Sequence, residues 1–206
     1  MNLYIATLAE LKTMLGITDT GDDSAITQMA VAIQGRFDSH CRRQFLYAAS
    51  QTEYLDGGVS ELLVHRWPIA SIASIIVDID QAWSTDDALA STDYRLNMKR
   101  GKIVYGTGTY PWPEGFQNIR VVYAGGFVKS DGTAADHVEA GDLETLRRGF
   151  LMQVGYEWRN KEILGITQIS QNGASVQAGA GVALALKGMT LMPEVELTLQ
   201  PLKRTV

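Results

Sequence analysis

The chain is poor in the residues that build covalent or metal-based sites. Its 206 residues include one cysteine, Cys41, and 3 histidines. A single cysteine excludes an intramolecular disulfide and a zinc site made of several thiolates. This scarcity fits a reducing compartment, so we expect the protein to be cytosolic where it is made.

Long apolar runs are missing as well. The opening MNLYIATLAELK lacks the basic segment and the apolar run of a signal peptide, so none is expected. No stretch approaches the roughly 18 apolar residues of a membrane span. We therefore expect no membrane partner.

Positive charge is not in excess. The formal net charge is −5 and charged residues make up 20% of the chain. Binding to nucleic acid through phosphate contacts needs a basic surface, so this chain is not expected to grip DNA. A hydrophobic content of 46% supports a buried core. The length suits one large domain or a domain with an inserted subdomain.

Two helices are predicted before residue 50. Thr7 and Glu10 have the spacing of a capping box, and Gly16 is placed to end this short helix. Asp22 or Asp23 is expected to cap a longer helix that runs to about residue 43. Its apolar face consists of Ile26, Met29, Ile33, Phe37 and Cys41.

The acidic junction GITDTGDDSAI, residues 16–26, raises the question of a calcium site. An EF-hand loop needs glycine at its sixth position and glutamate at its twelfth. Counted from Asp19, those positions hold Ser24 and Ala30. Helix capping and turn chemistry is therefore the better interpretation.

Residues 51–124 alternate with a period of two and predict about five strands. Asp56-Gly57-Gly58 predicts a tight hairpin, and a second hairpin is expected to turn at Lys99–Gly101. SIASIIVDID and NIRVVYAGGF predict two further strands. The helical period then returns, with Asp142 as the expected N-cap and an apolar stripe formed by Leu143, Leu146, Phe150, Val154 and Trp158.

Residues 165–190 are rich in Gly, Ala, Ser and Gln, which is typical of a flexible arm. Such an arm costs entropy unless it orders on a partner, so we expect residues from about 162 onward to be disordered or differently folded in a free subunit. Apolar residues return in LMPEVELTLQPLKRTV.

The predicted fold class is α+β. It consists of a small helical bundle of three main helices, an inserted antiparallel β-rich subdomain and a long C-terminal arm. The expected boundaries are 1–50 for the N-terminal helices, 51–124 for the β subdomain, 125–164 for the last core helix with its leading loop, and 165–206 for the arm and a short terminal element.

No motif predicts catalysis. There is no Gly-x-Ser-x-Gly elbow, and the glycine-rich loop 106–115 lacks the Lys-Ser/Thr of a phosphate-binding loop. DHVEAGD at 136–142 matches no metal motif and is interpreted as a solvated loop. Cys41 lies on an apolar helix face, where a buried structural thiol is the default. We expect no enzyme activity, no cofactor and no metal.

Several residues are candidates for contact with a partner. The 106–115 loop carries Tyr110 and Trp112, and aromatic side chains of this kind are enriched at interfaces. Three basic pairs are interpreted as solvated faces, although in a ring of subunits they could pair with acidic neighbours or face DNA. The pairs are Arg42-Arg43, Arg147-Arg148 and Lys203-Arg204.

Several segments, taken in order, resemble tailed-phage head–tail connector proteins of the gp6-like adaptor type. The N-terminal resemblance spans IATLAELKTMLGITDTGDDSAITQMAVAIQGRFDSHCRRQF, with Gly16–Asp19, Asp22-Asp23 and the Arg42, Arg43, Phe45 run. TEYLDGG, WPIASIASI and VVYAGGF resemble strands of members with a β insertion. DLETLRRGFLMQVGYEWRNKE with LGITQIS resembles the last core helix and the following turn, and LMPEVELTLQPLKR resembles the usual ending. Leu202, where an aromatic is common, and the Ala/Gly stretch 174–185 depart from the pattern.

The resemblance implies a structural virion protein at the neck, present in the host cytoplasm during assembly. Adaptors of this kind form a homo-oligomeric ring, usually a dodecamer, beneath the portal protein. The ring extends the DNA channel, passes genomic DNA without sequence-specific binding, and carries the stopper or tail-terminator protein. Partner contacts are then expected at Tyr110, Trp112, Trp158, Arg159, Pro193, Val195, Leu197, Lys203 and Arg204.

Two alternatives stay open. A stopper or tail-completion protein of the neck also forms rings, but such proteins are built largely on a β-barrel, and the three predicted helices argue against it. A carbohydrate-binding β module using the 106–115 loop needs a pocket with convergent polar groups, which the sequence does not reveal.

Overall fold

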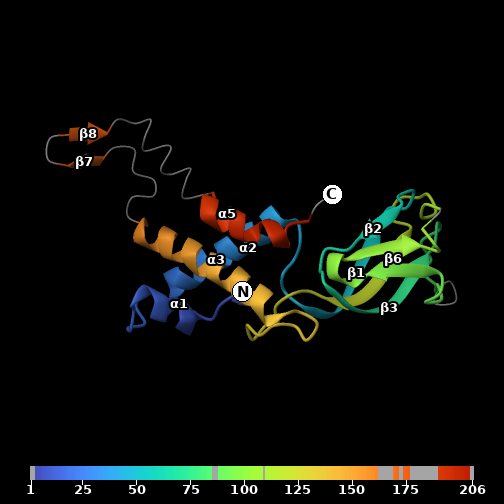
Figure 1. The fold of residues 1–206 in the computed structure, drawn as a ribbon, viewed down its shortest axis with the longest axis horizontal. Helices are drawn as coiled ribbons and strands as arrows, with labels where there is room; N and C mark the ends of the chain where they lie inside the picture. The colour runs from blue at the N-terminus through green and yellow to red at the C-terminus, as the bar shows by residue number, and fades with distance from the viewer. Residues whose placement is uncertain are drawn as a thin grey trace. The chain divides into compact units, whose positions relative to one another are not determined.

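The chain folds into two units (Figure 1). The computed structural model describes residues 3–84, 88–108, 110–161, 169–171, 174–176 and 190–204. One unit, here called the helical unit, comprises Met1–Cys41 and Gly141–Lys203. The other, the β unit, comprises Arg42–Ala140 and Arg204–Val206. The predicted domain boundaries differ from this division and stay predictions.

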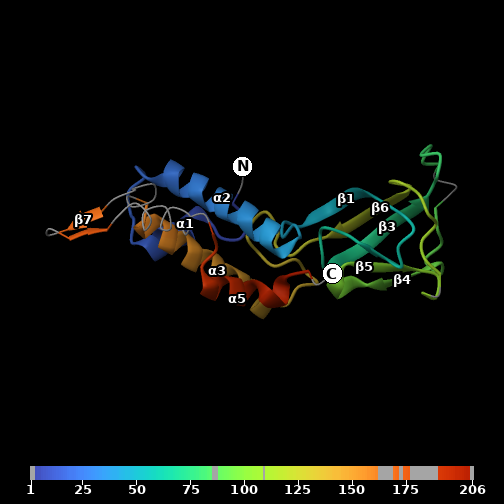
Figure 2. The same ribbon diagram turned by 90° about the horizontal axis from the view of Figure 1, so that it is seen from above.

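The helical unit is built on α1 (Leu8–Leu15), α2 (Asp23–Cys41), α3 (Ala140–Arg159) and α5 (Pro193–Leu199), which continues into the 3-10 turn η3 (Gln200–Leu202). Figure 2 shows α2 and α3 running past each other, with α5 lying along α3. The unit therefore joins helices from both ends of the chain.

The junction between α1 and α2 agrees with the prediction. Thr7 caps α1 through a complete capping box with Glu10, and Gly16 ends the helix in the left-handed conformation at φ 72°. Helix α2 begins at Asp23, whose carboxylate lies 2.7 Å from the Lys12 ammonium. The acidic loop thus starts a helix and holds it against α1.

The core of the helical unit forms where α2 and α3 meet. Ile26, Ile33 and Phe37 of α2 are buried, and the Phe37 ring meets the Phe150 ring edge-on at 5.7 Å. Four residues of the predicted α3 stripe are buried as expected, whereas Trp158 is half-buried. The apolar stripes of both helices therefore bury each other.

Helix α5 packs against α3 at Gly149. A Cβ at this position would lie 3.4 Å from the Thr198 side chain, so glycine lets the two helices approach closely. Val195 and Leu199 of α5 are buried, as are Leu191 and Leu202 on either side of it. The end of the chain, expected as a terminal element after an arm, contributes to the core of the helical unit.

The β unit contains two three-stranded antiparallel sheets. One has the order β1-β6-β3 and the other the order β2-β5-β4. The strands are β1 (Ala48–Leu55), β2 (Glu61–Leu63), β3 (Ile69–Val77), β4 (Tyr94–Asn97), β5 (Lys102–Tyr105) and β6 (Ile119–Gly125). Antiparallel sheets beside separate helices make the fold class α+β, as predicted.

One core joins the two sheets. Trp112 and Tyr123 are its largest side chains, and apolar residues from both sheets surround them. The cluster comprises Leu62, Val64, Ile69, Ile75, Ile103, Trp112, Ile119, Val121 and Tyr123. Sheets that alternate buried and exposed residues commonly pack in this way.

The two predicted hairpins had different outcomes. β4 and β5 pair with each other around the 3-10 turn η2 (Met98–Arg100) and Gly101, as expected. The hairpin at Asp56-Gly57-Gly58 is wrong, because β1 pairs with β6 and β2 pairs with β5. Gly57 instead donates to the Gly115 carbonyl at 2.9 Å, so this turn binds the 112–118 loop.

Two further predictions concern the start of α3 and the C-terminal arm. Asp142 is not the N-cap of α3, because the helix begins earlier, at Ala140. Within the predicted arm, β7 (Ile169–Gln171) and β8 (Ala174–Val176) form an antiparallel pair. Most of 165–190, and with it the expectation of disorder from about residue 162 onward, lies outside the described residues.

Candidate functional site

The aromatic pair of the 106–115 loop is split between surface and core. Tyr110 is 73% exposed, whereas Trp112 is 1% exposed. The Trp112 indole donates to the Ile103 carbonyl at 3.2 Å, and its ring lies 5.0 Å from that of Tyr105. Trp112 thus anchors the loop from within, and only Tyr110 reaches the surface of the subunit.

The C-terminal half of α3 carries the next two predicted residues. The Lys161 ammonium lies 3.5 Å from the centre of the Trp158 ring. This cation–π contact covers part of one ring face. Arg159 is exposed on the same helical turn. Both residues are therefore at the end of α3, at the surface of the helical unit.

The predicted residues near the C-terminus differ in exposure. Pro193 is exposed and Leu197 is 71% exposed, but Val195 is buried against α3. Lys203 is half-buried, and Arg204 donates to the Val64 carbonyl in the β unit. Val195, like Trp112, is thus a core residue of the folded subunit and not part of its surface.

A groove runs along the outer side of α3. Its volume is about 480 Å³. Its lining comes from α1, from α3 and the residue after it, and from the residue before α5: Met14, Glu144, Arg147, Arg148, Leu151, Met152, Gly155, Tyr156, Arg159, Asn160 and Met192. Gly155 makes room for Met14, because a Cβ there would lie 3.3 Å from the Met14 sulfur. Of the predicted interface residues, the groove contains Arg159 alone.

Sequence reasoning missed this groove. Leu151 lies at the edge of the stripe that the helical period assigns to the core and Met152 lies opposite that stripe, and neither is among the buried residues of α3. An apolar residue opposite the stripe, Met152, was the available signal. Met14 and Met192 come from distant parts of the chain, and their approach to α3 has no local sequence signal.

The basic pairs are also divided. Arg43 is buried, with its guanidinium 3.4 Å from the centre of the Trp67 ring, so the interpretation as a solvated face is wrong for this residue. Arg147 bonds Glu144 at 2.9 Å and the Ile5 carbonyl at 3.3 Å. Arg42 and Arg148, the other members of these pairs, are exposed. One arginine of each pair therefore holds the fold.

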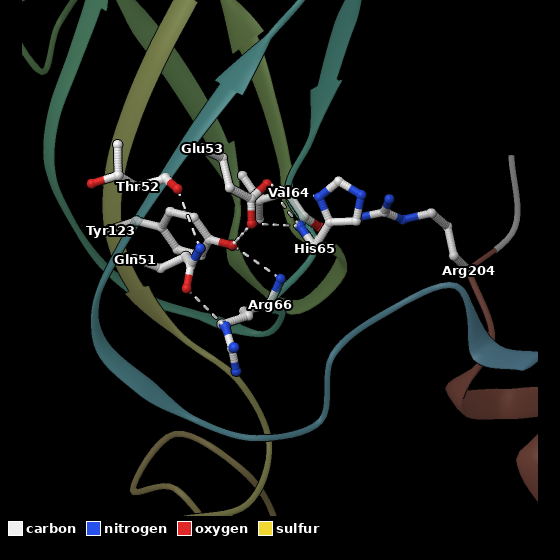
Figure 3. Close-up of polar contacts among 8 residues, drawn as sticks. All are labelled: Gln51, Thr52, Glu53, Val64, His65, Arg66, Tyr123 and Arg204. Carbon is white, nitrogen blue, oxygen red and sulfur yellow. Dashed lines mark hydrogen bonds and ion pairs between the residues drawn. The ribbon is translucent and has the colours of Figure 1, made fainter. Parts of the chain in front are cut away.

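A polar cluster occupies one end of the β unit (Figure 3). The Glu53 carboxylate accepts from the Tyr123 hydroxyl and from the His65 backbone amide, and it lies 2.9 Å from His65 Nδ1. Arg66 donates its amide to the Tyr123 oxygen at 3.0 Å. The cluster thus ties β1, β6 and the segment after β2 together.

The contacts of the cluster shift the pKa values of Glu53, His65 and Tyr123, and burial shifts that of the neighbouring Arg204. Burial opposes ionisation of Glu53, but hydrogen bonds from His65 and Tyr123 outweigh it and hold the carboxyl pKa below its ordinary value. The hydrogen bond to Glu53 raises the pKa of His65. Burial, followed by the Glu53 charge, raises the pKa of the Tyr123 hydroxyl, and burial lowers that of the Arg204 guanidinium. The arrangement therefore favours a charged Glu53–His65 pair.

We expect this pair to make stability depend on pH. Because the folded-state pKa of His65 lies above 6.5, its contribution is fully present below that pH and is lost as the pH rises through the raised value. The Glu53 contribution is present above pH 4.5 and is lost as the pH falls through the lowered pKa. The His65 side chain is 59% exposed, so solvent screening limits the effect to about 1 kcal/mol or less.

Thermal unfolding of the wild type and His65→Gln tests this expectation. The wild type should exceed the variant in Tm by more at about pH 5.5 than at about pH 8.5, since only the lower pH protonates the imidazole. His40→Gln, in the last turn of α2, serves as the control for loss of an imidazole. Equal differences in Tm at both pH values contradict the charged pair.

Neither a metal site nor a membrane span is found in the part of the chain that the structure describes. There, no group of three or more His, Cys, Asp or Glu side chains is arranged to hold a metal ion. Asp136 of the DHVEAGD segment pairs with Lys129 at 2.6 Å, and His137 Nε2 lies 3.1 Å from the Pro68 carbonyl. None of the described helices is both long and apolar enough to span a bilayer.

Comparison with solved structures identifies the fold. A chain in the neck of an empty gene transfer agent particle, computed with C6 symmetry, matches with a TM-score of 0.58 and 11% identity, over 98% of this chain and 91% of that chain. The two chains share a fold. Chains from the virion of a native gene transfer agent particle and from a native neck computed with C12 symmetry match with TM-scores of 0.46 and 0.39, at 15% and 16% identity. They cover 91% and 90% of this chain, and 91% and 88% of their own.

The likeness is structural and not visible in sequence profiles. No protein-family model and no curated protein sequence matches this chain. The shared fold extends over both the helical unit and the β unit, because the match covers 98% of the residues.

Proposed function

We propose that this chain is a structural subunit of the neck of a tailed-phage-like particle. Its place there is that of a head–tail adaptor in a ring beneath the portal. The fold match over nearly the whole chain carries the proposal, since the matched chain belongs to the neck of a gene transfer agent particle. The order of adaptor-like segments along the sequence supports it independently of the fold.

The surface of the subunit suits assembly. A closed ring of identical subunits needs two different, complementary patches on each subunit. The helical unit offers an apolar groove at α3 and an exposed leucine on α5, Leu197. C6 symmetry in the matched neck agrees with a ring whose subunit number is six or a multiple of six.

The acidic balance suits a channel that passes DNA. With a net charge of −5, the chain as a whole repels the phosphate backbone, so a ring of such subunits would let DNA slide without holding it. The proposed partners are the portal protein above the ring and a stopper or tail-terminator protein below it. Tyr110, Trp158, Arg159, Pro193, Leu197 and Lys203 remain the proposed contact residues, because they are at least partly accessible on the subunit.

Direct binding to the portal protein tests the adaptor role. Purified subunit and purified portal of the same particle are mixed, and the products are separated by size and imaged in negative stain. We expect a ring attached to the portal, in register with its symmetry.

The stopper role is distinguished by the same mixture. A stopper joins the neck below the adaptor, so it would leave the portal bare unless another neck protein were added. Binding only to a preformed portal–adaptor complex would overturn the adaptor assignment, and binding to neither would count against a neck role altogether.

A further inference from the structure

The groove along α3 has an apolar floor and a basic rim. Met14, Leu151, Met152 and Met192 supply the apolar surface. The charged lining residues are three arginines and one glutamate, and Arg147 already pairs with that glutamate, Glu144. The groove therefore carries positive charge that its own acidic residue does not balance.

Two of these arginines are available to a partner. Arg148 and Arg159 are exposed, and neither side chain forms a hydrogen bond or ion pair in the part of the chain that the structure describes. Both lie on the outer side of α3, eleven positions apart, which is about 16 Å along a helix. An occupant of the groove thus meets apolar side chains in the middle and a cation toward each end.

Helix α5 presents a surface of the opposite kind. Val195 and Leu199 are buried, which fixes the rotation of the helix and holds Leu197 outward at 71% exposure. Glu194 is exposed one turn before Leu197, on the same side of the helix, and Glu196 is half-buried beside it. An exposed leucine on a rigid helix, flanked by carboxylates, matches the groove in both polarity and charge.

We propose that α5 of one subunit docks in the α3 groove of a second copy of this chain. Leu197 enters the methionine floor, whose flexible thioethers can close around it. The carboxylates of Glu194 and Glu196 meet Arg148 and Arg159. Because the two patches differ, the contact runs head to tail, which is the kind of contact that a closed ring of subunits requires. The inference rests on the proposed ring and names the surfaces that join its subunits.

Disulfide trapping tests the contact. Leu197→Cys and Met152→Cys are made in separate chains, mixed with the portal protein, and oxidised after assembly. The native Cys41 is fully buried and gives little background. We expect heterodimers linked between the two new cysteines, because seated side chains come within reach of a disulfide. Each variant assembled alone should give few linked dimers, since a head-to-tail contact never brings two Leu197 positions together.

The matched control is Thr18→Cys, an exposed site in the junction before α2, in place of Met152→Cys. It should not trap Leu197→Cys. Dimers from Leu197→Cys alone would show a two-fold contact and overturn the proposal. Rings seen by microscopy without the mixed disulfide would also overturn it, for example if the chain's own residues 162–189 or a portal segment filled the groove, and would leave the neck role intact.

Charge reversal gives an independent measurement. Arg148→Glu with Arg159→Glu should weaken ring assembly about tenfold or more, as for a central interface site. Adding Glu194→Arg and Glu196→Arg in the same chain should restore it. Leu197→Met should assemble like the wild type and Leu197→Glu should not. Unchanged assembly by the doubly reversed arginine variant contradicts the pairing, provided that circular dichroism shows a folded chain.

Discussion

Trp112→Ala should lower the free energy of unfolding by about 3–5 kcal/mol. The side chain is 1% exposed at the centre of the core that joins the two sheets, so truncation leaves a large cavity. It also removes the hydrogen bond from the indole to the Ile103 carbonyl. Urea unfolding, followed by circular dichroism, measures the loss.

Tyr110→Ala is the matched control for that substitution. Tyr110 lies in the same loop but is 73% exposed, and surface truncations usually change stability by less than about 0.5 kcal/mol. The pair of variants separates an anchor of the core from a contact for a partner. If Trp112→Ala were as stable as Tyr110→Ala, the core assignment of Trp112 would be wrong.

Arg36→Met should destabilise the helical unit by about 3 kcal/mol. Arg36 Nη2 lies 2.6 and 2.7 Å from the two Glu157 oxygens and so joins α2 to α3. Gln153 donates to Glu157 at 2.7 Å and also accepts from the Met192 amide at 2.9 Å, which extends the network to the start of α5. Removing the arginine leaves a buried carboxylate without its cation.

A second substitution shows whether the loss of stability arises from the unpaired Glu157 carboxylate. Adding Glu157→Gln to Arg36→Met removes the carboxylate but keeps the side chain's shape, so much of the lost stability should return. Chemical unfolding of the wild type, Arg36→Met, Glu157→Gln and the double variant completes a double-mutant cycle. Additive losses would contradict a direct ion pair.

Local signals accounted for much of the helical unit. The capping box at Thr7 and the left-handed Gly16 set the ends of α1, because both act within a few residues. The same holds for the β4–β5 hairpin, whose turn residues lie next to each other. Features that depend on neighbours in sequence could therefore be predicted from it.

Long-range pairing could not be predicted in this way. The Asp56-Gly57-Gly58 turn has the composition of a hairpin, but its hydrogen bonds go to a loop about 60 residues later, and β1 pairs with β6. Arg43 looked like a surface residue because its aromatic neighbours, Trp67 and Phe127, are distant in sequence. The candidate groove likewise depends on methionines from three parts of the chain.

The proposed role as a ring subunit at the neck of a particle can be tested on whole particles. Electron microscopy of particles carrying an affinity tag on this chain, labelled with a gold-bound antibody, tests it most directly. We predict label at the junction of head and tail, and a ring of six or twelve subunits at that level in averaged images, as C6 symmetry in the matched neck allows. Label spread over the head or along the tail, or a neck without density for this fold, would contradict the claim.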